Sequence, residues 1–516
     1  MQQTDVIVIG GGHNALVAAT FLARAGLSVR LLEQKKALGG ATRTEQPFEK
    51  APNLKQSTGA YLLGLMPPEL IQKLGATLPV IRRDPHYFLP TEGDRYLLFG
   101  SDRAATKRQF ERFFSAEDWA ADERLQAELA MLRADVGPTW LEEPYTIEET
   151  AERYVRPELR QVFVALCRGS VGDYLDRFGF KSDLVKAMYA VTDGFSGVNG
   201  TWSTPGTGMN FLVHNMCRLP DADGTWMIVR GGMGAIAQEL GRLARAARVH
   251  IETDAPVEHI EYASGSVSGV ALSDGSIRKA KVVVSGADPF QLMKLAGPER
   301  LGSLTQKIEG FQRDGTTLKL NMCLKELPRF RCLPGDHGQH QATIHLLPQE
   351  REVLASLESS YADVQAGRLP EFPTIEWYIH TSVDRTLQDE EGRHSAALFV
   401  QWVPYELAES TWEAEETRYA DHLLSIADRF APGTSDLVID TFVLTPPKIE
   451  SHFGISRGHI HHVDNCFGFS DRMPYATPVE GLYACSAGCH PAGSVIGAAG
   501  HNAAIKILRD LGAKPT

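Results

Sequence analysis

Glycines near the N-terminus have the types and spacing that could hold a phosphate-bearing cofactor. Gly10 and Gly12 follow the apolar run 6–9, and Ala15 takes the third small position. Gly10 allows a sharp turn, Gly12 lets a pyrophosphate approach the N–H groups at a helix N-terminus, and Ala15 keeps helix and strand close. Glu33 lies 23 residues after Gly10, where its carboxylate can accept hydrogen bonds from ribose hydroxyls. Together these positions predict a dinucleotide site.

The residues around these glycines predict the elements that would hold them in place. Residues 5–9 read as a buried parallel strand, 16–26 as an apolar helix and 27–32 as a second strand. The alternative is a glycine-rich turn without a ligand, but the strand, the helix and the acid all agree with a bound nucleotide. Glu33 disfavours a 2′-phosphate, so a cofactor that ends in plain adenosine fits better than NADP.

A second glycine pair distinguishes FAD from NAD. Gly39, Gly40 and Thr42 follow Glu33 after a short spacer, and this order resembles the second FAD motif of the glutathione-reductase and amine-oxidase superfamily. Within it, Gly12-His13-Asn14 resembles the phytoene-desaturase-like branch. That branch includes bacterial carotenoid desaturases, a beta-carotene ketolase type and a group like pyridine nucleotide-disulfide oxidoreductase domain-containing protein 2. The resemblance implies FAD as the cofactor and places His13, Asn14 and the glycine pair beside it.

Two later blocks extend this resemblance over nearly the whole chain. Residues 229–285 read as a Gly-Gly turn, a helix, strands and a hairpin, and resemble the second portion of the FAD domain, where Val257 would contact the adenine. Residues 480–504 read as a strand, a glycine turn and a small-residue helix that opens near His490. In the family this helix points its N-terminal N–H groups at the flavin. The residues that the resemblance places there are Gly488, Pro491, Gly493, Val495 and Gly497.

The fold class that follows is α/β. We expect a Rossmann-type, glutathione-reductase-like FAD domain from residues 1–75, 226–300 and 440–516, and an interleaved α+β substrate domain from 76–225 and 301–439. The first insert reads as mostly helical, with charge-rich helix over 102–133. The second contains strand candidates at 317–324, 374–381 and 396–403 and a charged helix over 409–431.

Composition limits the classes of partner and the compartment. The chain has 516 residues, of which 43% are hydrophobic, and a net charge of −12, which argues against nucleic acid because phosphate binding needs basic clusters. Seven scattered cysteines form no disulfide pattern and favour reduced thiols in the cytoplasm, with Cys466 and Cys489 as free thiols rather than covalent flavin links. No apolar run is long enough to span a membrane.

Several histidines are candidates for lining the active site. His214 ends an apolar segment that the family has in its substrate region, although a core or capping role is the more common one for such a residue. His462 lies in a segment that resembles one near the flavin, and His490 opens the C-terminal block. The four histidines between 452 and 462 lack the acid or cysteine of a usual metal site, so we expect no metal.

The apolar stretch 56–68 has three interpretations. It is read first as an ordinary core helix, and otherwise as the lining of a substrate tunnel or a surface that touches a bilayer. The last interpretation, together with the apolar substrates of the family, suggests the hypothesis of a peripheral membrane contact. The sequence does not indicate the oligomeric state.

Three functions remain open. The first is an FAD-dependent dehydrogenase or desaturase that takes a hydride from a C–H bond of an apolar, isoprenoid- or polyene-like small molecule, with no catalytic acid or base named by the sequence. The second is an oxidase of an amine or amino-acid-derived substrate. It calls for an aromatic pair or a lysine and water at the flavin, which the sequence does not show clearly. The third is a flavin-bearing binding or scaffold protein with little turnover.

Overall fold

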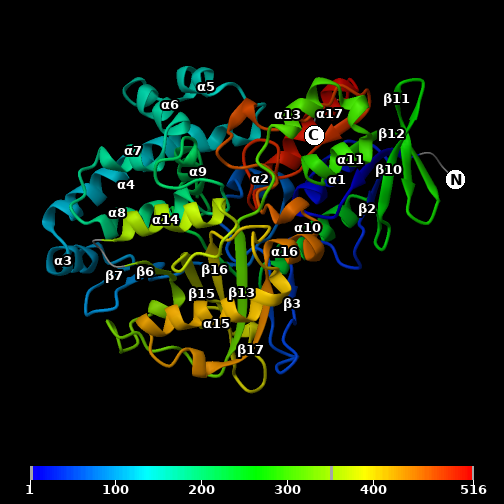
Figure 1. Cartoon of the computed structure of the whole chain (residues 1–516). Helices are drawn as coiled ribbons and strands as arrows, with labels where there is room; N and C mark the ends of the chain where they lie inside the picture. The colour runs from blue at the N-terminus through cyan, green and yellow to red at the C-terminus, as the bar shows by residue number, and fades with distance from the viewer. Residues whose placement is uncertain (1–3, 223, 349–351, 514–516) are drawn as a thin grey trace.

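Strands from three separate parts of the chain build the first sheet. The computed structural model describes residues 4–222, 224–348 and 352–513, and Figure 1 shows this sheet among the helices on the right. Its strands are β1 (Thr4–Ile9), β2 (Val29–Leu32), β9 (His250–Glu252), β10 (Val257–Ala263), β11 (Ser266–Leu272), β12 (Ile277–Ser285) and β18 (Leu482–Ala484). The order is β10-β11-β12-β1-β2-β9, and β18 pairs with β12. Around β1 all pairs are parallel, as expected for a Rossmann-type sheet.

Helices from both ends and from the middle of the chain pack on this sheet. They are α1 (His13–Arg24), α10 (Gly234–Ala246), α11 (Pro289–Ala296), α12 (Pro298–Leu301), α13 (Ser303–Glu309) and α17 (Ala498–Asp510). The contact between α1 and α17 is so close that a Cβ on Gly500 would lie 2.0 Å from the backbone O of Asn14. The small residues predicted near the C-terminus therefore bring the last helix against the first one.

A second sheet forms the centre of the other half of the molecule. Its strands are β6 (Tyr87–Pro90), β7 (Tyr96–Phe99), β13 (Thr317–Leu324), β14 (Thr343–Leu346), β15 (Thr374–Ile379), β16 (His394–Gln401) and β17 (Val438–Leu444), in the order β17-β13-β16-β15-β14-β6-β7. The long helix α15 (Trp412–Phe430) covers one face of this sheet, below it in Figure 1. The predicted α/β class with an interleaved α+β part is confirmed, although the expected boundary at 439–440 falls inside β17.

The first insert is less purely helical than its sequence indicated. Most of it forms the helices α3 (Arg103–Phe113), α4 (Ala116–Val136), α5 (Ile147–Tyr154), α6 (Arg160–Arg168), α7 (Val171–Asp176), α8 (Asp183–Tyr189) and α9 (Thr207–His214), which α14 (Val353–Gln365) joins. However, β6 and β7 also come from this insert, and they extend the second sheet because β6 pairs with β14 and β7 pairs with β6. The single charged helix expected over 102–133 is divided by Ser115, whose hydroxyl caps α4 by accepting from the N–H of Asp118.

The apolar stretch 56–68 is not a helix, so the first interpretation of it was wrong. It begins with β4 (Gln56–Ser57), which pairs with β3 (Thr44–Glu45), and continues without regular structure to α2 (Pro68–Leu74). Close approaches explain this course, because a Cβ on Gly59 would lie 2.4 Å from the backbone O of Ala41. Every residue of the stretch is buried or half-buried, so it gives no surface for a bilayer.

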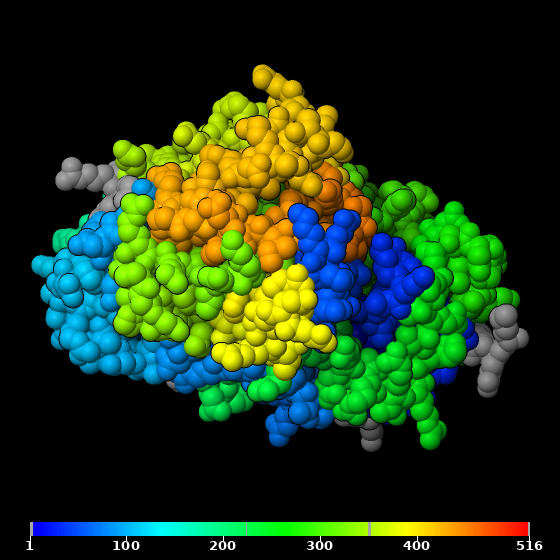
Figure 2. Space-filling view, turned by 90° about the horizontal axis from the view of Figure 1, so that it is seen from below, coloured from blue at the N-terminus to red at the C-terminus, as the bar shows by residue number. Residues whose placement is uncertain are grey.

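Segments from the two ends of the chain also meet at the lower face of the molecule. Figure 2 shows the blue N-terminal segment beside the orange segment of α16 (Pro446–Phe453). There Arg43 donates through Nη2 to the backbone O of His452 at 3.1 Å.

A short strand pair, β5 (Val80–Ile81) with β8 (Ile228–Val229), joins two further segments of the chain. None of the helices in the described ranges is both long and apolar enough to cross a bilayer.

Candidate active site

One cavity of about 400 Å³ connects the two sheets. At one end it is lined by the turn between β1 and α1, and at the other end by β13, β15 and β16 of the second sheet. Most of the predicted cofactor residues meet there: Gly10, Gly12, His13, Asn14, Ala15, Glu33, Gly39, Gly40, Thr42, Val257 and Val495. A ligand that extends from the glycine turn would therefore reach the second sheet.

The glycine turn is shaped to receive a phosphate. Gly10 has φ +92°, a left-handed conformation that glycine adopts without strain. A Cβ on Gly12 would meet no atom within 4 Å, so the space beside this residue is open. Gly12 also caps the N-terminus of α1, where backbone N–H groups and the helix dipole favour an anion.

The carboxylate of Glu33 is held at the end of β2 by backbone N–H groups. Oε2 accepts from the N–H of Gly11 at 2.6 Å, and Oε1 accepts from the N–H of Lys35 at 2.8 Å. A Cβ on Gly11 would lie 3.0 Å from Oε2 and 2.7 Å from Cδ2 of Leu38, so glycine favours this close approach. Each oxygen keeps a further lone pair for a ligand hydroxyl.

The second glycine pair packs directly on the first. Gly39 donates from its N–H to the backbone O of Gly11 at 2.9 Å, and the hydroxyl of Thr42 donates to the backbone O of Gly39 at 2.5 Å. Gly39 and Gly40 both have positive φ. This turn therefore continues the cavity wall beyond Glu33.

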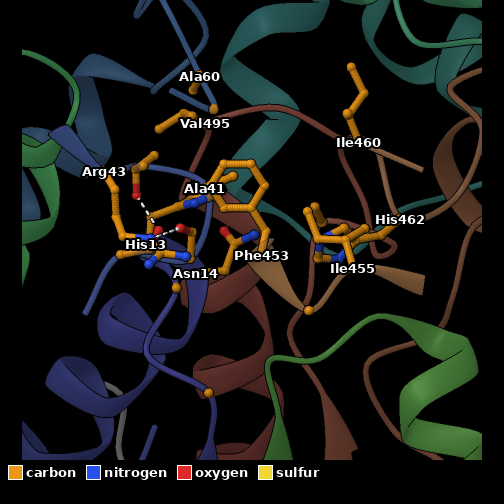
Figure 3. Close-up of a pocket in the computed structure, with 18 of the residues that line it drawn as sticks. His13, Asn14, Ala41, Arg43, Ala60, Phe453, Ile455, Ile460, His462 and Val495 are labelled. Carbon is orange, nitrogen blue, oxygen red and sulfur yellow. Dashed lines mark hydrogen bonds between the residues drawn. The ribbon is translucent and has the colours of Figure 1, made fainter. Parts of the chain in front are cut away.

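Polar atoms at the start of α1 fit a bound dinucleotide. His13 Nε2 and Asn14 Oδ1 are buried, and neither atom has a hydrogen-bond partner among the described residues. In Figure 3 both side chains lie at the centre of the pocket, where Phe453 and His462 approach from other segments. Because buried polar atoms normally have partners, these two are suited to bind a ligand.

The C-terminal block contributes less of the wall than predicted. Val495 lines the cavity, whereas Gly488, Pro491, Gly493, Gly497 and His490 are not part of its lining. These residues lie in the loop before α17, since the helix begins at Ala498 and not near His490. Gly493 is required for packing, because a Cβ there would lie 2.4 Å from the Cα of His461. Its N–H donates to Oδ1 of Asn465 at 2.8 Å.

The histidines that line the cavity are neutral at physiological pH. Burial lowers the pKa of His13, His214 and His462 to about 4, and that of His461 to about 3. His214 closes α9 and lies 3.2 Å from the backbone O of Thr192, so it has a structural contact and also faces the cavity. His490 packs against the Phe469 ring at 5.5 Å instead. Neutral imidazoles can orient a ligand but add no charge.

A buried arginine that no sequence pattern singles out fixes the loops beside the cavity. Arg472 donates to the backbone O atoms of Cys489, at 3.1 Å, and Ala487, at 2.8 Å, and to those of Val463, Asp464 and Phe467. It thereby ties residues 463–467, next to His462, to the turn before α17. A single arginine in a loop carries no local signal for such a role.

The substrate end of the cavity contains residues that sequence reasoning missed. Lys319 on β13, Glu376 and Tyr378 on β15 and Phe399 on β16 all line it, together with Tyr61 from the irregular stretch. The alternation of side chains along β13 could have indicated that Lys319 lies on the face opposite α15. Leu318, Leu320 and Met322 face α15, so the residues between them face away from it. The position of the cavity on that second face comes from the topology.

Burial strongly shifts the pKa values of Lys319 and Glu376. Lys319 is 5% exposed and Glu376 is 6% exposed. Burial lowers the pKa of Lys319 to about 7 and raises that of Glu376 to about 8. The ammonium of Lys319 lies 4.2 Å from the ring centroids of both Tyr61 and Phe399. The structure thus contains the lysine and the aromatic pair that the sequence did not show clearly.

The cysteines and the possible metal ligands are spread through the molecule. Within the described ranges, no group of three or more His, Cys, Asp or Glu side chains could hold a metal ion. All seven cysteines are free, and Cys466 is the only one that is not fully buried.

Comparisons with known proteins point to one family. The family model for flavin containing amine oxidoreductase matches residues 16–361. The chain is 33% identical to pyridine nucleotide-disulfide oxidoreductase domain-containing protein 2 of Mus musculus, over 98% of this chain and 94% of that protein. It is 24% identical to one component of the limonene dehydrogenase of Castellaniella defragrans, over 99% and 96% of the two chains. A zeta-carotene-forming phytoene desaturase of Myxococcus xanthus is 25% identical over 89% and 84%.

A solved structure shares the fold. Putrescine oxidase bound to putrescine aligns with a TM-score of 0.62 at 16% identity, over 99% of this chain and all of that one. At this identity the likeness concerns the fold alone. The family match, together with the glycine turn that lines the cavity, establishes FAD as the cofactor.

Proposed function

Because the chain belongs to the flavin containing amine oxidoreductase family, we propose that this FAD-dependent oxidoreductase is a dehydrogenase or desaturase of an apolar, isoprenoid-like substrate. The observation that carries the proposal is the single cavity that joins the dinucleotide turn to the second sheet. A substrate bound against the face formed by β13, β15 and β16 would lie at the end of the cavity opposite the dinucleotide turn.

The residues of the chain orient the substrate and keep water out. When bound, FAD supplies the acceptor at N5 for a hydride from a substrate C–H bond. Leu62, Trp226 and Ile460 line the cavity, and with the rings of Tyr61 and Phe399 they form the apolar part of the wall at its substrate end, beside the polar Lys319 and Glu376. Such a wall holds a chain in one orientation and excludes water from the reacting carbon.

Two relatives support an isoprenoid substrate. Limonene and phytoene, which appear in their names, are hydrocarbons built from isoprene units, and both relatives align over most of this chain. Residues of the irregular stretch 59–62 line the cavity, in agreement with the tunnel interpretation of that stretch. The proposal therefore depends on the wall of the cavity as well as on the resemblance.

The test is anaerobic bleaching of the flavin. Purified holoprotein is mixed with limonene or phytoene in liposomes and, in parallel, with a panel of amines, and flavin absorbance is followed. We expect bleaching by the isoprenoids. Bleaching by amines alone would overturn the proposal, and no bleaching by any donor would favour the binding or scaffold function.

Amine oxidation is the second candidate, and a specific observation favours it. Lys319 lies in the cavity wall with Tyr61 and Phe399 beside it, which are the residue types that an amine oxidase would call for. The amine panel in the same experiment separates the two functions. A Lys319→Met variant that loses bleaching by an amine but keeps bleaching by limonene would assign the lysine to amine chemistry.

A further inference from the structure

The second sheet has one apolar and one polar face, although both are buried. Leucine, isoleucine and methionine side chains of β13, β15 and β16 face α15. The opposite face carries Thr317, Lys319 and Asn321 on β13, with Glu376 and Tyr378 on β15, and all five are less than a tenth exposed. A polar face away from water is costly unless its groups have partners.

Strand register brings Lys319 and Glu376 into one row across the sheet. Lys319 pairs with Phe399, Phe399 pairs with Glu376, and Glu376 pairs with His345. Side chains of directly paired residues project from the same face. Three members of the row, Lys319, Phe399 and Glu376, line the cavity, so the row forms its floor at the substrate end.

Most neighbouring polar groups already have protein partners. The hydroxyl of Tyr61 donates to Oδ1 of Asn321 at 3.1 Å, and Arg83 donates to the hydroxyl of Thr343 at 2.8 Å. Tyr378 donates its hydroxyl to Oε2 of Glu376. Among the described residues, no hydrogen bond reaches Oε1 of Glu376 or Nζ of Lys319, whose ammonium lies between the two aromatic rings.

We propose that Lys319 and Glu376 form a subsite for a neutral oxygen atom, a hydroxyl or carbonyl, of an otherwise apolar substrate. Nζ of Lys319 and the free carboxyl oxygen of Glu376 can both hydrogen-bond such an atom, whereas the rings of Tyr61 and Phe399 contact the adjoining carbon chain. The inference rests on the proposed function and adds to it the class of substrate.

A neutral polar atom suits this pair better than an ionic group. A substrate ammonium would meet the ammonium of Lys319, which already occupies the space between the two rings. A substrate carboxylate would bring a further charge into the buried row that contains Glu376, whereas a neutral oxygen avoids this desolvation cost. With a pKa of about 8 the Glu376 carboxyl is mostly protonated at neutral pH, so it can donate to a neutral oxygen without adding charge.

The test uses four ligands with one carbon skeleton and the intact holoprotein. Geraniol, the hydrocarbon that lacks its hydroxyl, geranylamine and geranic acid are titrated anaerobically, and the Kd is taken from the change in the flavin spectrum. We expect geraniol to bind about tenfold more tightly than the hydrocarbon, as one or two hydrogen bonds would give, and more tightly than the amine and the acid.

Matched variants identify the groups responsible. Glu376→Leu and Lys319→Met should each reduce the preference for geraniol to less than about threefold. Glu376→Gln should keep the preference, because glutamine resembles the protonated acid. Ser395→Ala is the control, since Ser395 is buried on β16 and does not line the cavity.

The outcomes separate the subsite from the proposed function. Equal affinity for the four ligands, tighter binding of the amine or the acid, or no binding by any of them would overturn the subsite. If limonene still bleached the flavin in that case, the proposed function would stand without it. Bleaching by geranylamine alone would instead overturn the proposed function.

Discussion

Replacing Glu376 with glutamine should change how the stability of the protein depends on pH. Burial raises the pKa of Glu376 from 4.5 to about 8, so the folded protein binds this proton more tightly than the unfolded chain does. The resulting stabilisation is complete below pH 4.5 and is lost as the pH rises through about 8. Glutamine has no such proton to lose. The melting temperature of the variant should therefore rise relative to that of the wild type across this window.

The size of the effect follows from the pKa. Between about pH 5 and about pH 8 the wild type should lose roughly 3 kcal/mol, at about 1.4 kcal/mol per pH unit with rounding at both ends. Attraction between ionised Glu376 and Lys319 offsets part of this loss, which makes the figure an upper limit. An unfolding entropy of about 2.1 cal/mol/K per residue gives about 1.1 kcal/mol/K for 516 residues. The expected change is therefore up to about 3 °C.

Thermal unfolding followed by circular dichroism, with FAD in fixed excess at each pH, measures this difference. Glu371→Gln is the matched control, because Glu371 is an exposed carboxylate just before β15. The melting temperature of this control should follow that of the wild type at every pH. A difference between Glu376→Gln and the wild type that stays constant or falls from about pH 5 to about pH 8 would refute the assignment of a raised pKa to Glu376.

Four further substitutions test the cofactor end. Gly12→Val should fold but lose FAD, because the valine side chain would fill the open space beside the glycine turn that the cofactor needs. A wild-type ratio of flavin to protein absorbance would contradict this. Gly500→Ala should lower the melting temperature by about 1–3 °C, since its Cβ would lie 2.0 Å from the backbone O of Asn14 and overpacking costs about 1–3 kcal/mol. Arg472→Lys should lower the melting temperature by about 3–5 °C, because contacts with backbone carbonyls are lost. An unchanged melting temperature would mean that Arg472 does not stabilise these loops. Glu33→Ala should weaken FAD binding about tenfold by equilibrium dialysis, and an unchanged Kd would remove Glu33 from the site.

The cofactor end could be predicted from the sequence because its determinants are local. Gly10, Gly12 and Glu33 lie within one strand–helix–strand unit, where glycine fixes the turn and the apolar runs fix the elements. Their spacing along the chain is therefore also their arrangement in space. The same argument holds for β13 and α15, whose apolar periods are regular and whose observed bounds lie within a few residues of those predicted.

The stretch 56–68 could not be predicted in this way. Its apolar composition is that of a core helix, but contacts with distant residues decide its conformation. A Cβ on Gly59 would lie 2.4 Å from the backbone O of Ala41, and one on Gly64 would lie 2.6 Å from Sγ of Cys217. Such approaches depend on the assembled fold and leave no periodic signal.

Lys319 and Glu376 show why the substrate end escaped the sequence. They lie on strands far apart in the chain and share one row only because β16 pairs with both. Each strand by itself reads as ordinary alternation with one polar face, which normally faces water. Here that face is covered by the first half of the chain, including Tyr61.

An apolar floor would suffice for a pure hydrocarbon substrate, since buried charged pairs are often replaced by apolar residues without loss of stability. A buried lysine and glutamate there depart from the rule that a buried sheet face is apolar, and such departures are expected at functional sites. The polar floor is therefore better explained by a group on the substrate than by the needs of the fold.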